Sequence, residues 1–360
     1  MEPFLNANFG NPSSVHHMGR LARAALDAAR ERVARVFGCK PSEIVFTSGG
    51  TESVNLALFG SARSRRPLGR HIVTSSIEHH AVLNACQYLE RSENFEVTYL
   101  PVNAQGMVEV HSVEKAIRSD TILVSIMAAN NETGAIQPVA EIGALCRSRG
   151  IPFHTDAVQW FGKKPFASIA QFNADFVSLC AHKIHGPKGA GALFVKSPFR
   201  VNPILFGGAH ENEQRAGTEN VASIVGMAEA VERFVHNAVF EAVTLTSLTA
   251  QIEKTVQSIT GVVIRSPANR LANTLSFTVS GCDSISLLAS LDVEGICASS
   301  GAACSVGSLE PSHVLLAMGI PRDLANSFVR FSLGCGSTAE EVSYVCSILP
   351  LVIDRIRSSS

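Results

Sequence analysis

The feature that most constrains the fold of this chain is a regular alternation of helical stretches with short apolar runs. A helical stripe from about residue 16 to residue 37 ends at Gly38, and the apolar run Ile44-Val45-Phe46 follows it. Further apolar runs, each predicted to be a strand, lie at Ile72–Thr74, Val97–Leu100, Ile122–Met127, Pro152–His154, Phe176–Leu179 and Ala192–Val195. Strands that alternate with helices predict an α/β fold, with a mainly parallel sheet covered on both faces.

The pattern changes in the last third of the chain. Residues 229–259 are helical in character and contain no strand pattern. They are followed by a predicted strand at Thr274–Val279, a helix near 284–291, a loop rich in glycine and serine, and a terminal helix from about Ala339. We therefore expect a large domain over residues 1–238 and a smaller α+β C-terminal domain over residues 239–360.

Composition excludes several classes of protein. Hydrophobic residues make up 46% and charged residues 17% of the 360 residues, which excludes a disordered chain. The 30 Lys and Arg residues balance 31 Asp and Glu residues, which argues against a nucleic-acid-binding protein. No apolar run approaches the roughly 18 residues that cross a bilayer, and the first residues do not resemble a secretory signal. The nine cysteines include no Cys-x-x-Cys pair, which indicates reduced thiols in a cytoplasmic protein.

Ser48-Gly49-Gly50-Thr51 lies where a strand turns into a helix. The backbone amides at a helix N-terminus, together with a hydroxyl group, can bind a phosphate. A glycine pair at such a turn also has a purely steric explanation, so both interpretations remain open at this point.

Two more strand ends carry polar side chains. Asp156 and Gln159 follow the run at 152–154, where α/β enzymes place ligand contacts, although an Asp that caps the next turn explains the residue equally well. His182 and Lys183 follow the run at 176–179, and the chain has only eight lysines. A desolvated lysine can form a Schiff base, whereas the alternative is an ordinary surface lysine in a turn.

The segment from Ser299 to Ser305 is small, polar and flexible around Cys304. Such a sequence does not build a core, so its thiol is a candidate reactive group. A phosphate site, an acid and a Schiff-base lysine are together what pyridoxal phosphate requires, and the mobile cysteine adds a candidate reactive thiol.

The sequence resembles the pyridoxal-phosphate cysteine desulfurases of the class V aminotransferase group. The matching stretches cover nearly the whole chain in the family's order: Phe9 to Ser14, Thr47 to Ser53, Glu78-His79, Asn130 to Gly134, His182-Lys183, Arg215 to Thr218, Ser299 to Leu309 and Val329 to Gly334. The sequence after Cys304 is similar to the long-loop subgroup, which supplies sulfur to iron–sulfur cluster scaffolds.

The resemblance implies a type I fold of pyridoxal-phosphate enzymes, a homodimer and a set of residue roles. Lys183 holds the cofactor and moves protons, His79 stacks on its ring, Asp156 pairs with the ring nitrogen and Gln159 contacts the phenolic oxygen. The phosphate is bound by Gly50, Thr51, His182, the residue at position 180 and Thr218 of a partner subunit.

For the substrate, L-cysteine, the resemblance implies that Arg330 and Asn131 grip the carboxylate and that Cys304 takes the sulfur as a persulfide. The products are L-alanine and sulfur for a scaffold or another acceptor protein. No metal site is expected, because the adjacent His79 and His80 have no evident third ligand.

Three positions depart from the family pattern. The strand that relatives carry before the Phe9 segment does not precede it here, Cys180 stands in place of a serine, and Asn212 stands where many relatives have arginine. Alternatives to a desulfurase are a selenocysteine lyase or aminotransferase of the same class, a truncated paralogue of low activity, and a scaffold or sulfur relay without cofactor. An aminotransferase has no need of Cys304, which favours the desulfurase.

Overall fold

A computed structural model describes residues 1–237, 242–301 and 310–359 of the chain. It separates into two compact units. The first comprises Met1–Leu100, Val110–Ala128 and Pro138–Val239, and the second comprises Pro101–Glu109, Ala129–Gln137 and Phe240–Ser360. Two short segments from the first half of the chain therefore belong to the second unit, which a single division near residue 238 does not capture.

The first unit is built on a seven-stranded sheet in the order β1-β7-β6-β5-β4-β2-β3. The strands are β1 (Ile44–Thr47), β2 (His71–Ser75), β3 (Glu96–Leu100), β4 (Thr121–Ser125), β5 (Phe153–Asp156), β6 (Phe176–Cys180) and β7 (Gly191–Val195). Within the described residues, β7 runs opposite to the other six strands of this sheet and is antiparallel to both β1 and β6. The prediction of a mainly parallel sheet is confirmed, and each strand lies where an apolar run predicted it, because six of the seven are wholly buried.

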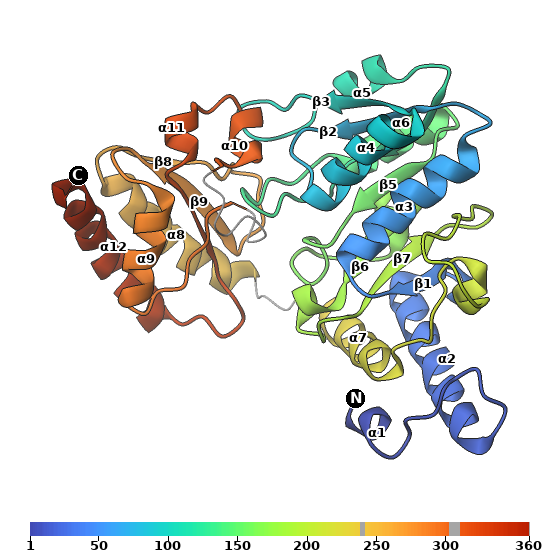
Figure 1. Ribbon diagram of the computed structural model, residues 1–360. Coiled ribbons are helices and arrows are strands. Elements are labelled where there is room, and N and C mark those ends of the chain that lie inside the picture. The colour runs from blue at the N-terminus through green and yellow to red at the C-terminus, as the bar shows by residue number, and fades with distance from the viewer. Residues whose placement is uncertain (238–241, 302–309, 360) are drawn as a thin grey trace. The chain divides into compact units, whose positions relative to one another are not determined.

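Helices cover this sheet on the side that Figure 1 shows in front, where α3 and α4 run across it. The helices of the unit are α1 (Glu2–Leu5), α2 (His17–Phe37), α3 (Gly50–Arg65), α4 (His80–Glu93), α5 (Val110–Ala116), α6 (Val139–Ser148) and α7 (Val221–Phe234). Helix α3 packs on β4 to β7 and against α4, and α2 packs along α7. Val54 and Leu58 of α3 and Val82 of α4 share one core with Ile72 and Leu123 of the sheet. The apolar faces of the helices thus fix where their N-termini lie.

An aromatic cluster holds the chain that follows β5. The rings of Phe37, at the end of α2, and Phe161 are stacked with their centroids 5.2 Å apart, and Phe166 and Phe172 pack against Phe161 edge-on or tilted. Phe37, Phe161 and Phe172 are almost completely buried. The residues just after Asp156 are therefore supported by a dense core.

The second unit contains an antiparallel sheet in the order β10-β9-β8. Its elements are α8 (Ala242–Ser258), β8 (Val262–Ile264), β9 (Thr274–Val279), α9 (Ser284–Val293), α10 (His313–Ala317), α11 (Arg322–Ala325), β10 (Phe328–Ser332) and α12 (Ala339–Ser359). Helix α12 packs against α8 and α9, and the core contains Phe277, Leu287, Val329 and Leu349. The predicted strand at 274–279 and the predicted terminal helix are confirmed.

The helices of the described residues include none that is long and apolar enough to cross a bilayer.

Candidate active site

Three of the predicted site residues meet where β5 and β6 end side by side. Asp156 is the last residue of β5 and Cys180 the last of β6, and the two strands are parallel neighbours. A turn of 3-10 helix, Ala181–Ile184, follows β6 and carries His182 and Lys183. The charge of Lys183 acts on both Asp156 and Cys180, so the strand ends bring the acid, the thiol and the amine together.

Asp156 is buried in the first unit, with only 6% of its surface exposed. Burial raises the pKa of its carboxyl group to about 6, although the N–H of Val158, which donates to Oδ1 over 2.9 Å, and the charge of Lys183 both oppose the rise. Because this pKa lies near neutral pH, a positive charge close to Asp156 changes the ionised fraction of its carboxyl group strongly.

Glu78 is a second buried acid beside this one, and the sequence analysis assigned it no role. Its Oε1 accepts hydrogen bonds from Ser75 Oγ at 2.6 Å and from Met127 N at 3.0 Å, which ties the end of β2 to the end of β4. Burial raises the pKa of Glu78 to about 8, and the charge of Asp156 adds to the rise. An acid directly before His79, at the end of a fully buried strand, is the signal that could have singled it out.

The N-terminus of α3 closes in on the same strand ends. A Cβ added to Gly50 would lie 2.9 Å from Val158 Cγ2 and 3.7 Å from Cys180 Cβ, so this position requires a glycine. The Cys180 thiol receives backbone N–H groups of Gly50 and Lys183, while burial raises its pKa to about 11. The N-terminus of α3 thus directs a backbone amide towards a neutral thiol, and a helix N-terminus is suited to an anion.

His79 and Thr51 line one hollow of about 420 Å³, together with Asn55, Ala81 and Tyr88 among others. His79 caps α4, and its Nδ1 accepts a hydrogen bond of 3.1 Å from Ala81 N. This bond fixes the orientation of the imidazole ring.

Gln159 is held by Lys163, which the sequence analysis did not consider. Lys163 Nζ donates a hydrogen bond to Gln159 Oε1, so the amide NH2 is the end of Gln159 that can donate to a ligand. Burial lowers the pKa of His182, and the charges of Lys183, Lys188 and Lys163 lower it further. The three lysines therefore give His182 positively charged surroundings. The only indication of this in the sequence was the small number of lysines in the chain.

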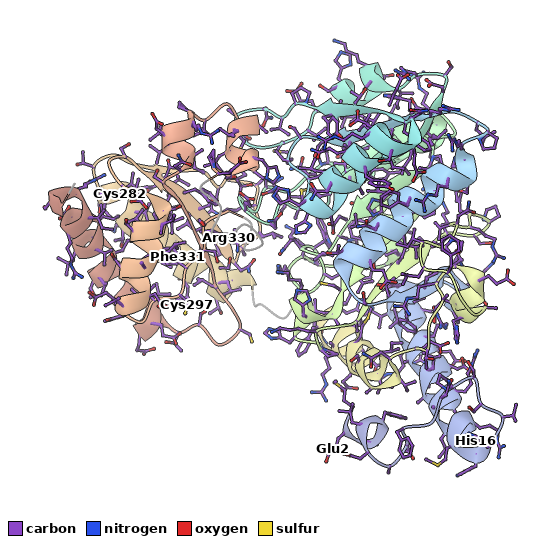
Figure 2. All side chains as sticks on the ribbon, viewed as in Figure 1. Glu2, His16, Cys282, Cys297, Arg330 and Phe331 are labelled. Atoms are coloured by element: carbon purple, nitrogen blue, oxygen red, sulfur yellow. The ribbon has the colours of Figure 1, made fainter. Side chains whose placement is uncertain are left out.

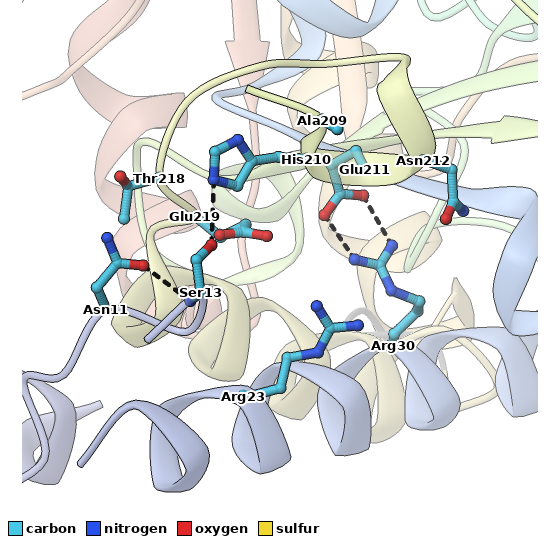
Figure 3. Close-up of a pocket in the computed structure, with 10 residues that line it drawn as sticks. All are labelled: Asn11, Ser13, Arg23, Arg30, Ala209, His210, Glu211, Asn212, Thr218 and Glu219. Carbon is cyan, nitrogen blue, oxygen red and sulfur yellow. Dashed lines mark hydrogen bonds and ion pairs between the residues drawn. The ribbon is translucent and has the colours of Figure 1, made fainter. Parts of the chain in front are cut away.

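Thr218 lies apart from these residues, in a polar pocket of about 510 Å³ that Figure 3 shows. None of the other predicted site residues lines this pocket, whose walls include Asn11, Ser13, Arg23, Arg30, His210, Glu211, Asn212 and Glu219. Arg30 binds both carboxylate oxygens of Glu211, at 2.8 and 2.5 Å. Asn212 has a left-handed backbone with a φ of 56°, which asparagine adopts more readily than arginine, so the departure from the family suits the local backbone.

The two predicted carboxylate-binding residues, Asn131 and Arg330, both belong to the second unit. Arg330 lies on β10, where Figure 2 shows it next to Phe331, and its guanidinium donates to the backbone oxygen of Asn131. The contact is therefore with the main chain of Asn131 rather than with its amide. Burial lowers the pKa of Arg330, and the charge of Glu132 opposes this effect. Cys304 lies outside the described residues.

Comparison with known proteins assigns a family. Residues 1–345 match the profile described as aminotransferase class-V. A protein of Dictyoglomus turgidum named cysteine desulfurase IscS is 45% identical over 362 residues, which cover 100% of this chain and 91% of the relative. A protein of the same name from Methanosarcina thermophila is also 45% identical, over 100% of this chain and 89% of its own.

Solved structures agree with this result. A structure named NifS-like protein superposes with a TM-score of 0.91 and 37% identity, and covers 98% of this chain and 94% of its own. Another, described as SspA in complex with cysteine, superposes with a TM-score of 0.82 and 37% identity over 94% of each chain. The expected fold class and family resemblance are both confirmed.

Proposed function

This chain belongs to the class V aminotransferase family, and from that premise we propose that it is a pyridoxal-phosphate-dependent cysteine desulfurase. The enzyme converts L-cysteine to L-alanine and transfers the sulfur to its own Cys304. The observation that carries the proposal is the convergence of Asp156, Cys180, Lys183 and the N-terminus of α3 at the ends of two parallel strands.

The donors at this place fit pyridoxal phosphate. The cofactor needs an amine for its aldehyde, a carboxylate for its ring nitrogen and amides for its phosphate, and Lys183, Asp156 and the first turn of α3 offer these groups. Thr51 and His182 are further phosphate donors, and a Cβ at position 50 would fill the close approach to Val158. Cys180 offers only a weak thiol donor, so we assign most of the phosphate binding to its neighbours.

When it is bound, the cofactor withdraws electrons from the substrate's α-carbon, which is the chemistry needed to release sulfur from the β-carbon. Lys183 holds the cofactor and carries a proton at Nζ to and from the substrate. Asp156 holds a proton on the ring nitrogen, because a cation there favours the ionised form of a carboxyl group whose pKa is raised to about 6. His79, whose ring is oriented by Ala81, would stack on the cofactor ring, and the Gln159 amide, fixed by Lys163, would donate to the phenolic oxygen.

The substrate carboxylate is bound by Arg330, whose guanidinium offers a planar pair of donors, and by Asn131. The thiolate of Cys304 then attacks the substrate sulfur. The bond between the β-carbon and sulfur breaks, a sulfur–sulfur bond forms on Cys304, and a proton completes L-alanine. Burial raises the pKa values of Cys146 and Cys180 to about 12 and 11, which makes these two thiols poor nucleophiles.

We further propose that the enzyme works as a homodimer in the cytoplasm and passes the sulfur to an iron–sulfur scaffold or another acceptor protein. Thr218, which lies apart from the other phosphate donors, then serves the site of the second copy. All eight described cysteines are free thiols, in keeping with a reducing compartment.

The test is to add L-cysteine to the purified enzyme and to measure alanine, sulfide and the mass of each cysteine peptide. We expect a sulfur atom on Cys304, while Cys304→Ser binds cysteine, as the visible absorbance of the cofactor shows, but forms neither persulfide nor alanine. The exposed Cys297 and Cys335 provide matched controls, and we expect their serine variants to keep full activity. Lys183→Ala loses the absorbance of covalently bound cofactor. A Cys304→Ser enzyme that still releases alanine and carries sulfur on Cys297 contradicts the proposal.

A further inference from the structure

Glu132 lies in a rigid turn of the second unit. Asn130 Oδ1 accepts hydrogen bonds of 2.9 Å from the backbone N–H groups of both Glu132 and Thr133, which is an Asx turn. Glu132 itself is only 1% exposed. The turn therefore presents a buried carboxylate in a defined direction.

The residues around this carboxylate are linked to Arg330 through backbone contacts. Ser312 Oγ donates a hydrogen bond to Glu132 Oε2, and a Cβ on Gly301 would lie 3.6 Å from the same oxygen. Two residues before Gly301, Ser299 pairs with the backbone of Arg330 through hydrogen bonds of 3.1 and 2.6 Å. Arg330 in turn donates to the carbonyl of Asn131, the residue next to Glu132.

The Arg330 side chain is half-buried, and a charge partly withdrawn from water favours a nearby counter-charge. Glu132 supplies a negative charge to Arg330, since it is the acid that opposes the effect of burial on the pKa of that guanidinium. A carboxylate that arrives at Arg330 therefore meets an anion that already interacts with the same cation.

We propose that Glu132 is a positioning residue that balances the charge of Arg330 before the substrate binds and thereby weakens the affinity for the carboxylate of the amino acid. This inference rests on the proposed function, in which Arg330 binds that carboxylate. Repulsion between the two anions limits how tightly both L-cysteine and L-alanine are held. Because the product keeps the carboxylate, the same repulsion speeds its release.

The experiment compares two amines that differ only in the carboxylate, L-alanine and ethylamine. Their dissociation constants are measured from the change in visible absorbance of the cofactor-loaded enzyme. Glu132→Gln keeps the size of the side chain and an oxygen that accepts from Ser312, but removes the charge. We expect it to bind L-alanine about three- to tenfold more tightly, as the loss of a partly screened repulsion implies, and to bind ethylamine as the wild type does.

Two further variants separate the possible causes. Ser312→Ala removes one hydrogen bond and keeps the charge, so the ratio of the two dissociation constants stays at its wild-type value. Glu132→Ala removes both the charge and the hydrogen-bond acceptor, and it should shift the ratio in the same direction as Glu132→Gln. The test therefore remains valid if one of these two variants fails to fold.

Arg330→Gln tests the underlying function, because it weakens L-alanine and leaves ethylamine unchanged if Arg330 binds the carboxylate. If Arg330→Gln has this effect but Glu132→Gln leaves L-alanine unchanged, weakens it, or tightens both amines equally, the role of Glu132 is wrong and the proposed function stands. If Arg330→Gln does not alter L-alanine binding, the assignment of Arg330 itself is wrong.

Discussion

Glu78 and Asp156 are two buried carboxyl groups of the first unit, and the charge of Asp156 makes Glu78 harder to ionise. Each has a pKa well above its ordinary value because burial disfavours the charged form. Glu78 accepts hydrogen bonds from Ser75 and Met127 and so joins two strand ends just before His79. A neutral side chain with the same oxygen can perform that task.

We therefore predict a pH-dependent gain in stability for Glu78→Gln. The pKa of Glu78 is about 8 in the folded chain and near 4.5 when unfolded, so the folded state retains a proton that the unfolded state releases. Wild-type stability is complete below pH 4.5 and falls as the pH rises towards 8. In urea unfolding of the cofactor-free protein, the variant should gain on the order of a few kcal/mol over the wild type between these pH values. Parallel pH profiles would refute this, and the exposed Glu31→Gln serves as control.

The chemistry of the site could be predicted from the sequence wherever one residue type is needed for one task. Lys183 and Asp156 follow recognisable strands, and the structure brings them together. Lys163 and Glu132 could not be predicted in the same way, because their roles depend on which side chain they face. The sequence does not reveal that Lys163 donates to Gln159 or that Glu132 shares a turn with the contact of Arg330.

At the scale of elements, the strands of the large sheet could be predicted because each contains a short apolar run and six of the seven are wholly buried, and those of the small sheet only in part. Strand β9 is wholly buried and was predicted, whereas β10 is interrupted by Arg330 and β8 has only three residues. The helical stretch predicted at 229–259 in fact covers parts of two helices, α7 and α8. The boundary was missed because amphipathic periodicity does not reveal where one helix stops and the next begins.

The segment that carries Thr218 is fastened to α2 by a buried ion pair, and we predict that Arg30 is worth much more to stability than Arg32 on the same helix. Glu211, the partner of Arg30, has a side chain only 1% exposed, whereas the partners of Arg32 are more than 40% exposed. Arg30→Met leaves a buried carboxylate without its ion-pair partner and should lower the free energy of unfolding by about 3–5 kcal/mol. Arg32→Met should lower it by about 1 kcal/mol or less. Denaturant unfolding measures both.

A second variant at the partner residue shows whether the stranded charge is the cause. Glu211→Gln keeps an oxygen for the N–H of Phe46, which donates to Glu211 over 2.8 Å. When it is added to Arg30→Met, it should restore much of the lost stability. Equal losses for Arg30→Met and Arg32→Met would contradict the proposed difference between the buried pair and the surface pairs.

For the whole molecule, exposed apolar residues near the Thr218 pocket are consistent with the proposed homodimer. Phe206 is 83% exposed and lies directly before the segment that lines the pocket, and Phe9 and Val15, at 75% and 89%, flank its other wall. Glu219 Oε2 and His210 Nδ1 in the same pocket are buried without a hydrogen-bond partner among the described residues. Exposed apolar side chains beside a polar pocket are typical of an interface.

We predict that Phe206→Glu disrupts the dimer and, with it, the retention of cofactor. The wild type should scatter light as a particle of twice the chain mass of 38.3 kDa. A charge at position 206 has to be desolvated in the interface, which shifts the protein towards the monomer. If Thr218 serves the partner's phosphate site, this monomer loses its cofactor on gel filtration, whereas Thr218→Ala stays dimeric and loses part of it. Val243→Glu, at a side chain 85% exposed on α8, is the matched control and changes neither property. A Phe206→Glu monomer that keeps all of its cofactor would mean that each chain completes its own site.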